Sequence, residues 1–136
     1  MLKFMLDTNI AIYVIKRRPL DLLEIFNRNA EHMGISAITL AELIHGVEKS
    51  SYPEKNLKVV EDFVSHLEVL PYDEDAASHY GNIRADLEKK GTTIGVNDLH
   101  IAGQARSRGL ILVSNNTKEF ERVEGLRLVD WTKQAG

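Results

Sequence analysis

The feature that most constrains the fold is a short apolar run near the start of the chain that stops abruptly at polar residues. Residues 3–6 read Lys-Phe-Met-Leu and are followed directly by Asp7, Thr8 and Asn9. Such a run predicts a buried parallel strand, and parallel strands of α/β sheets present their functional groups at the carboxyl edge. We therefore expect Asp7 at the rim of a sheet, facing a cleft. Thr8 or Asn9 is expected to cap the helix that Ile10–Ile15 begins.

The rest of the chain alternates further short apolar runs with amphipathic stretches. Strands are predicted at 33–36, 68–72 and 110–113, and the pattern allows an edge strand at 126–131. Helices are predicted at 20–29, 38–49 with Thr39 as cap, 53–67, 73–90, and 96–108 with Gly109 as its end. This alternation predicts an α/β fold, a three-layer α/β/α sandwich with a central parallel sheet.

Length and composition set the class of protein. A chain of 136 residues is expected to form one domain over residues 1–136, burying roughly two thirds of the surface that its unfolded form exposes. It contains no cysteine, no signal-peptide layout and no apolar run near the roughly 18 residues of a membrane helix. We expect a cytoplasmic protein with no membrane contact.

Charge is distributed unevenly. The net charge of −3 argues against a protein that holds nucleic acid by bulk electrostatics alone. Residues 105–133 nevertheless carry six basic side chains against four acidic ones. The alternative for these basic residues is a solvated surface. Candidate contacts to a phosphate backbone from this segment are Arg106, Arg108, Lys118 and Arg122.

Four acidic residues stand out by their settings. Asp7 ends the first strand, Glu42 lies among apolar neighbours, Asp98 opens a helix, and Glu119 follows the last inner strand. Carboxylates that converge on one cleft repel one another unless a cation holds them. Oxygen ligands without cysteine or clustered histidine suit Mg²⁺ or Mn²⁺. Such a site activates water and stabilises charge on a phosphoryl oxygen, which is the chemistry of nucleases.

Four segments together resemble a known family over nearly the whole chain. In their order and spacing they look like a PIN-domain ribonuclease, specifically the enteric-type VapC toxins of bacterial toxin–antitoxin pairs. The segments are Leu6-Asp7-Thr8-Asn9, Thr39-Leu40-Ala41-Glu42-Leu43-Ile44-His45-Gly46, Asn97-Asp98-Leu99-His100-Ile101-Ala102 and Leu112-Val113-Ser114-Asn115-Asn116-Thr117-Lys118-Glu119-Phe120.

The resemblance implies roles for the site residues. It makes Asp7 and Asp98 metal-binding carboxylates and Glu42 the third acid of the cluster. Many PIN domains carry a further aspartate where this chain has Asn116, which puts a strongly held second metal in doubt. Glu119, three residues on, is the candidate for the missing charge. Hydrogen-bonding support for the acids is then expected from Thr8 and Ser114.

The resemblance also implies an activity and partners. It implies a homodimeric endoribonuclease that depends on Mg²⁺ or Mn²⁺ and cleaves a structured RNA. Enteric-type relatives act on initiator tRNA in the anticodon loop. A cognate VapB antitoxin would neutralise the enzyme, with its C-terminal part in the cleft.

Three other interpretations of the sequence remain. The five histidines show no spacing typical of a zinc site, although His100 lies only two residues from Asp98. A phospho-acceptor signalling domain has a similar architecture, but it requires paired acids after the first strand and a lysine after the last inner strand. A binding module with a vestigial pocket differs from an enzyme only in lacking metal-dependent RNA cleavage.

Overall fold

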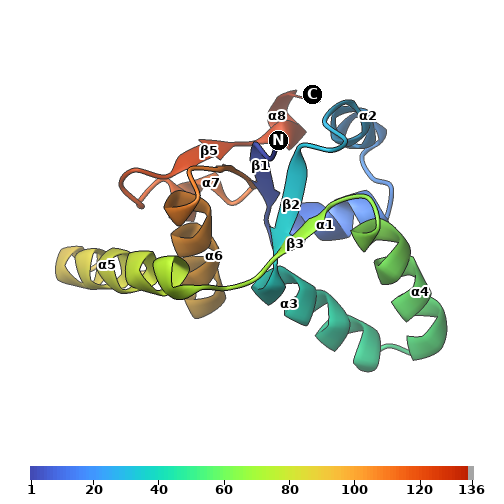
Figure 1. Cartoon of the computed structure of the whole chain (residues 1–136), viewed down its shortest axis with the longest axis horizontal. Coiled ribbons are helices and arrows are strands. Elements are labelled where there is room, and N and C mark those ends of the chain that lie inside the picture. The colour runs from blue at the N-terminus through green and yellow to red at the C-terminus, as the bar shows by residue number, and fades with distance from the viewer. Residues whose placement is uncertain (135–136) are drawn as a thin grey trace.

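The computed structural model describes residues 1–134 of the chain. A five-stranded parallel sheet in the order β3-β2-β1-β4-β5 forms its centre (Figure 1). The strands are β1 (Phe4–Leu6), β2 (Met33–Ser36), β3 (Glu68–Leu70), β4 (Ile111–Val113) and β5 (Arg127–Val129). The helices are α1 (Thr8–Ile15), α2 (Leu20–Arg28), α3 (Ala37–Glu48), α4 (Pro53–Val64), α5 (Glu74–Lys90), α6 (Val96–Ser107), α7 (Thr117–Phe120) and α8 (Trp131–Gln134).

Helices cover both faces of the sheet, which confirms the predicted three-layer fold. Successive side chains of a strand point to opposite faces, and in β1 Met5 and Leu6 are both completely buried in different core clusters. The cluster around Leu6 includes residues of α1, α2, α3 and α4, whereas the cluster around Met5 includes residues of α5, α6 and α7. Figure 1 shows these two groups of helices on either side of the strands.

The strand register brings three polar residues together at the carboxyl edge of the sheet. Leu6 pairs with Val113, and Val113 pairs with Val129. The next residue of each strand is therefore polar and stands beside the others: Asp7, Ser114 and Asp130. Backbone bonds continue through this level, because the N–H of Asp7 donates to Val113 O and that of Ser114 donates to Val129 O, each at 3.0 Å.

Two helix caps differ from the sequence prediction. Asp7 itself caps α1 by accepting a backbone N–H three residues on, so neither Thr8 nor Asn9 is the cap. Ser36 caps α3, where the sequence pattern favoured Thr39. In both places the chain turns from strand into helix without loop residues, so the residue that ends the strand level also caps the helix.

The C-terminal part of the chain also differs from the prediction. The expected edge strand at 126–131 is shorter, and Trp131 begins α8 instead. Its ring packs edge-on against Phe4 with centroids 5.0 Å apart, and this burial draws the chain out of the sheet. The cap of α6 is Arg108, and Gly109 follows it with φ of 65°, the left-handed conformation that glycine favours.

No helix within residues 1–134 combines the length and apolar character needed to cross a bilayer.

Candidate active site

Asp7 is a buried carboxylate whose two oxygens both accept hydrogen bonds. Its Oδ1 accepts the backbone N–H of Ile10 at 2.9 Å, and its Oδ2 accepts the hydroxyl of Ser114. Only 4% of the residue is exposed. Burial raises the pKa of Asp7 above its ordinary value, against the opposing effect of these two bonds, and the charges of Glu42 and Asp130 raise it further. Each oxygen keeps a second lone pair, so Asp7 can still bind a cation.

Glu42 reaches the same edge of the sheet from α3. The hydroxyl of Thr8, at the start of α1, donates to Glu42 Oε1 at 2.8 Å. The same hydroxyl oxygen lies 3.2 Å from that of Thr39. The sequence prediction that Thr8 and Ser114 would hydrogen-bond the acids agrees with these contacts, and their effect on metal binding stays a prediction.

Asp98 has the most perturbed titration of these carboxylates. It lies in the first turn of α6 and is partly buried. Burial raises the pKa of Asp98 to about 6, and the negative charges of Glu119, Asp7 and Glu42 act in the same direction. The four acidic residues singled out in the sequence therefore lie close enough to influence one side chain.

Glu119 and Asn116 are joined by a hydrogen bond. The Asn116 side-chain amide donates to Glu119 Oε2 at 3.0 Å, and its backbone N–H donates to Ser114 Oγ at 2.9 Å. Ser114 in turn donates to Asp7. The segment after β4 is thus tied to the buried aspartate, with Glu119 on the same side as Asp98.

The donor set fits a hard divalent cation in chemistry, although its side chains do not form a closed cage. Carboxylates that repel one another are stabilised when a cation binds between them, because its charge offsets the repulsion. Within the described part of the chain, however, no three acidic or histidine side chains are arranged to hold a metal ion as they stand. Mg²⁺ and Mn²⁺ commonly keep several waters and bind substrate phosphates, so a partial set of protein ligands still suits them.

The structure separates the four basic candidates. Arg106 and Arg108 lie at the end of α6 opposite to Asp98. The guanidinium of Arg106 donates to His79 Nδ1, Asn82 Oδ1 and Glu124 O at 2.7–2.9 Å, so its charge is used within the fold.

The other two basic candidates come from the α7 region. Arg122 donates to the backbone carbonyls of Thr92 and Thr93 at 3.5 and 3.3 Å. Lys118 is exposed on α7 beside Glu119. Of the four, Lys118 is therefore the side chain that lies exposed next to one of the four acids.

Two residues of this region were not predicted to belong to the acidic site. Thr39 is completely buried and lies one helical turn before Glu42. Asp130 follows β5 as Asp7 follows β1, and its Oδ1 accepts the backbone N–H of Thr132 at 2.9 Å. The sequence contains a pattern that could have predicted Asp130, because an apolar run ends on an aspartate there just as it does at Asp7.

The histidine near Asp98 belongs to the packing between α5 and α6. His100 Nδ1 bonds the Tyr72 hydroxyl at 2.7 Å, and the ring lies edge-on to Tyr80 with centroids 4.1 Å apart. Burial lowers the pKa of His100, so the neutral ring is favoured. Nothing in this arrangement supports a zinc site.

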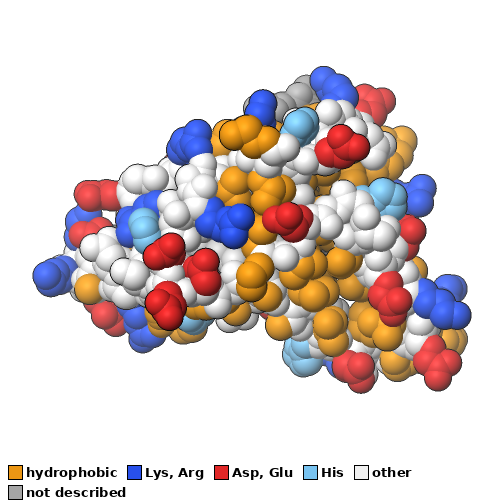
Figure 2. Space-filling view, in the orientation of Figure 1, with side chains coloured by type: hydrophobic (Ala, Val, Ile, Leu, Met, Phe, Trp, Pro, Cys, Tyr) orange, Lys and Arg blue, Asp and Glu red, His pale blue; other side chains and the backbone are white. Residues whose placement is uncertain are grey.

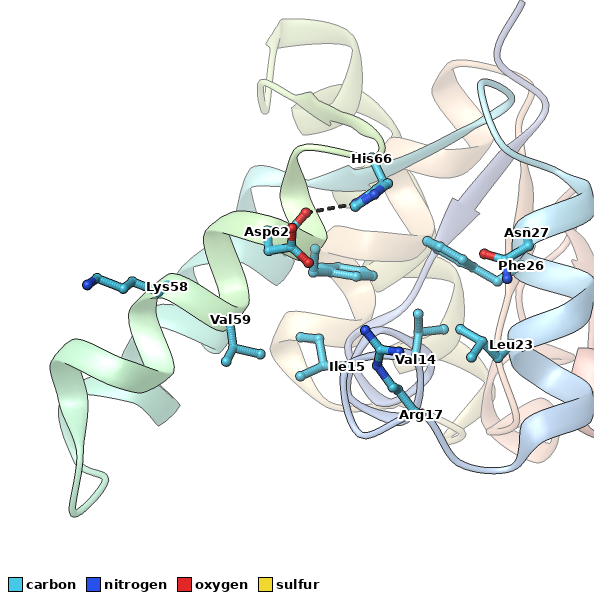
Figure 3. A pocket seen from close by; sticks show the side chains of 11 residues that line it. Val14, Ile15, Arg17, Leu23, Phe26, Asn27, Lys58, Val59, Asp62 and His66 are labelled. Atoms are coloured by element: carbon cyan, nitrogen blue, oxygen red, sulfur yellow. Dashed lines mark hydrogen bonds between the residues drawn. The ribbon is translucent and has the colours of Figure 1, made fainter.

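Two grooves run between the helices on the α1–α4 side of the sheet. The first, of about 560 Å³, lies between α1, α2 and α4, and Figure 3 shows Val14, Ile15 and Leu23 pointing into it. The second, of about 350 Å³, lies between α1, α3 and α4. Val59 lines both grooves, and Glu42 lines the second, which therefore reaches the acidic site.

Comparison with known proteins gives consistent matches. The PIN domain family matches residues 4–126. The chain is 62% identical to ribonuclease VapC2 of Haemophilus influenzae, over 96% of this chain and 99% of that protein. It is 59% identical to the tRNA(fMet)-specific endonuclease VapC of Shigella flexneri, over 97% of this chain and all of that protein.

Solved structures show the same likeness. The DNA-bound VapBC of Salmonella typhimurium superposes with a TM-score of 0.93 at 59% identity. VapBC2 of Rickettsia felis, bound to a fragment of promoter DNA, superposes with a TM-score of 0.90 at 39% identity. Each comparison covers 96% of this chain and 99% of the other.

Proposed function

The chain belongs to the VapC ribonucleases of the PIN-domain family. We propose that it is the toxin of a VapBC pair and that it acts as a Mg²⁺- or Mn²⁺-dependent endoribonuclease. The observation that carries the proposal is the convergence of four carboxylates at the carboxyl edge of the sheet, where burial and the charges of the other three raise the pKa of Asp98 to about 6. Residues 1–136 are proposed to act as one PIN domain.

The residues of the site have distinct proposed roles. Asp7 and Asp98 would hold the cation, which when bound supplies an activated water and stabilises charge on the phosphoryl oxygen. The Ser114 hydroxyl and the Ile10 N–H fix the plane of the Asp7 carboxylate. Thr8 fixes one oxygen of Glu42 in the same way.

Glu119 is the proposed fourth acid of the site. Its carboxylate is held by the Asn116 amide, which contributes no charge of its own. Glu119 therefore adds the negative charge that Asn116 lacks, directly or through a water.

The proposed substrate is initiator tRNA, cut in the anticodon loop. The support is the likeness to relatives named tRNA(fMet)-specific endonuclease, at 59% identity over almost the whole chain. A single-stranded loop can also splay its bases and bend its backbone into a cleft at a sheet edge, which a paired stem cannot do. Since tRNA is a cytoplasmic molecule, we assign the enzyme to the cytoplasm.

The proposed regulator is a VapB antitoxin that docks in the two grooves. Ile44, Leu57 and Val59 on α3 and α4 are apolar side chains with substantial exposure, and Val59 lines both grooves. Figure 2 shows hydrophobic side chains over this lower right part of the molecule, between charged ones. An amphipathic segment fits such grooves, and because Glu42 lines the second groove, a bound antitoxin would reach the acidic site. The toxin itself is proposed to be a homodimer.

Sequencing the RNA ends that appear on expression without antitoxin tests the function. New ends in the anticodon loop of initiator tRNA are expected, together with growth arrest. Asp7→Asn and Asp98→Asn keep shape while removing ligand charge, so folded variants should produce neither effect. Cleavage by a folded Asp98→Asn protein would contradict the assigned site, and an absence of new RNA ends with the unaltered protein would contradict the function.

A further inference from the structure

Three side chains form a hydrogen-bonded series from the protein interior to the acidic site. Thr39 Oγ1 lies 3.2 Å from Thr8 Oγ1, and Thr8 Oγ1 lies 2.8 Å from Glu42 Oε1. Thr39 is completely buried, and Thr8 and Glu42 are partly buried. The series links α1 with α3, two elements that leave neighbouring strands at the same edge of the sheet.

The number of protons fixes the direction of these bonds. The Thr8 hydroxyl carries one proton, and the ionised carboxylate of Glu42 can only accept. The proton that Thr8 donates to Glu42 is then not available to Thr39, so Thr39 must donate in the other contact.

The burial of Thr39 supports this direction. Threonine in a helix often donates to a carbonyl of the preceding turn, yet among residues 1–134 the side-chain hydrogen bond of Thr39 is to Thr8. A buried hydroxyl without a partner is costly. Thr39 is therefore satisfied by Thr8, and a hydroxyl that accepts one hydrogen bond becomes a stronger donor in the next.

We propose that Thr39 is a positioning residue: it directs the proton of Thr8 toward Glu42 and so holds Glu42 in place for a divalent cation. This inference rests on the proposed function of the site. Thr39 touches neither substrate nor metal and acts through Thr8 alone. Loss of its hydroxyl should therefore weaken cation binding only while Thr8 is present.

Calorimetric titration with Mn²⁺ of the metal-free full chain tests this, because it does not depend on RNA cleavage. Thr39→Val keeps the shape and removes the hydroxyl, and should raise the Mn²⁺ dissociation constant up to about tenfold, as loss of a ligand-supporting contact does. Thr39→Ser keeps the hydroxyl and should restore affinity to within about twofold of the unaltered protein. Ser50→Ala removes a hydroxyl that lies just past the C-terminal end of α3 and should leave the affinity unchanged.

A double-mutant cycle gives the decisive measurement. In a Thr8→Val background, Thr39→Val should cause no further loss, since the residue through which it acts is already missing. An equal loss in both backgrounds would overturn the proposal, as would an unchanged affinity of Thr39→Val or a Thr39→Ser variant as weak as Thr39→Val. Failure of the unaltered chain to bind Mn²⁺ would overturn it too. If the Mn²⁺ affinities follow the expected cycle but the unaltered protein cleaves no RNA, the proposed function is contradicted and this inference stands.

Discussion

Asp98 shows how a single residue reports on the whole acidic site. It is partly buried, and three other carboxylates act on it, so its pKa is raised from 3.8 to about 6. Its neighbours differ in how they are held: Asp7 by a backbone N–H and Ser114, Glu42 by Thr8, and Glu119 by an amide. The acids are thus fixed individually while their charges remain mutually unfavourable.

The raised pKa of Asp98, caused by burial and then by this repulsion, predicts a pH dependence of stability in the absence of metal. Because the folded pKa of Asp98 is about 6 and the ordinary value is 3.8, the folded state binds more protons than the unfolded state between these values. Stability therefore falls as pH rises through this window. In chelator, raising the pH from 4 to 7 should lower the unfolding temperature of both proteins. The fall should be larger in the unaltered chain than in Asp98→Asn, and the difference between the two falls should be roughly 3 °C. Equal falls in both proteins would show that Asp98 titrates normally.

Asn116 is the position where added charge should matter most. Asn116→Asp replaces an amide that donates to Glu119 with a second carboxylate, which should tighten Mn²⁺ binding about tenfold and destabilise the metal-free protein. Glu119→Gln should weaken Mn²⁺ binding and lower cleavage most at limiting Mg²⁺. Calorimetry and thermal unfolding in chelator measure both effects. Identical affinities in the three proteins would mean that neither side chain faces the cation.

The sequence predicted which acids lie together better than how they are held. The sequence singled out four acids by position: Asp7 and Glu119 follow strands, Glu42 interrupts an apolar helix pattern, and Asp98 opens a helix. The Thr39 contact could not be predicted, because it depends on the distance between α1 and α3. The partners of Arg106 could not be predicted for a similar reason, since they come from α5 and from the segment after α7.

At the level of elements, the helices divide into two groups with different surfaces. α5 and α6 pack closely on each other. Gly103 of α6 makes this possible because it has no Cβ, and a Cβ there would clash with the backbone nitrogen of Tyr80 at 2.9 Å. α1, α2, α3 and α4 pack less completely and leave the two grooves between them. Strand and helix order followed from hydrophobic periodicity, whereas these grooves depend on packing angles that periodicity does not specify.

Val59 is the residue with which to test the grooves, because it lines both and is 42% exposed. Val59→Asp places a charge where an apolar antitoxin side chain would be buried, so antitoxin affinity should fall about 100-fold while RNA cleavage is unchanged. Leu20→Asp, at an exposed apolar position outside both grooves, is the matched control. Calorimetry with the cognate antitoxin measures this. Unchanged affinity of Val59→Asp would place the antitoxin elsewhere.

For the whole molecule, a negative net charge has to be reconciled with an RNA substrate. With a net charge of −3, attraction to RNA must come from a few local contacts and from the cation. Lys118 is exposed beside Glu119, while Arg108 is exposed at the end of α6 opposite to Asp98.

The salt dependence of RNA binding distinguishes these two residues. Lys118→Gln should weaken binding and reduce the slope of log affinity against log salt by about 0.7, the contribution of one phosphate contact to single-stranded RNA. Arg108→Gln should leave the slope unchanged. A slope that falls equally in both variants would indicate a broad positive surface instead of a local contact.

The strand order also has a consequence for the time at which the enzyme becomes active during its synthesis. The central strand, β1, is made first, but one of its two neighbours is β4, which begins at residue 111. Ser114, which holds Asp7, and Glu119 come later still. At about 5–20 residues per second, the ribosome needs several seconds between these segments. A nascent chain therefore carries Asp7 without the strand and hydroxyl that complete its surroundings, and we expect it to cleave no RNA until translation is almost finished.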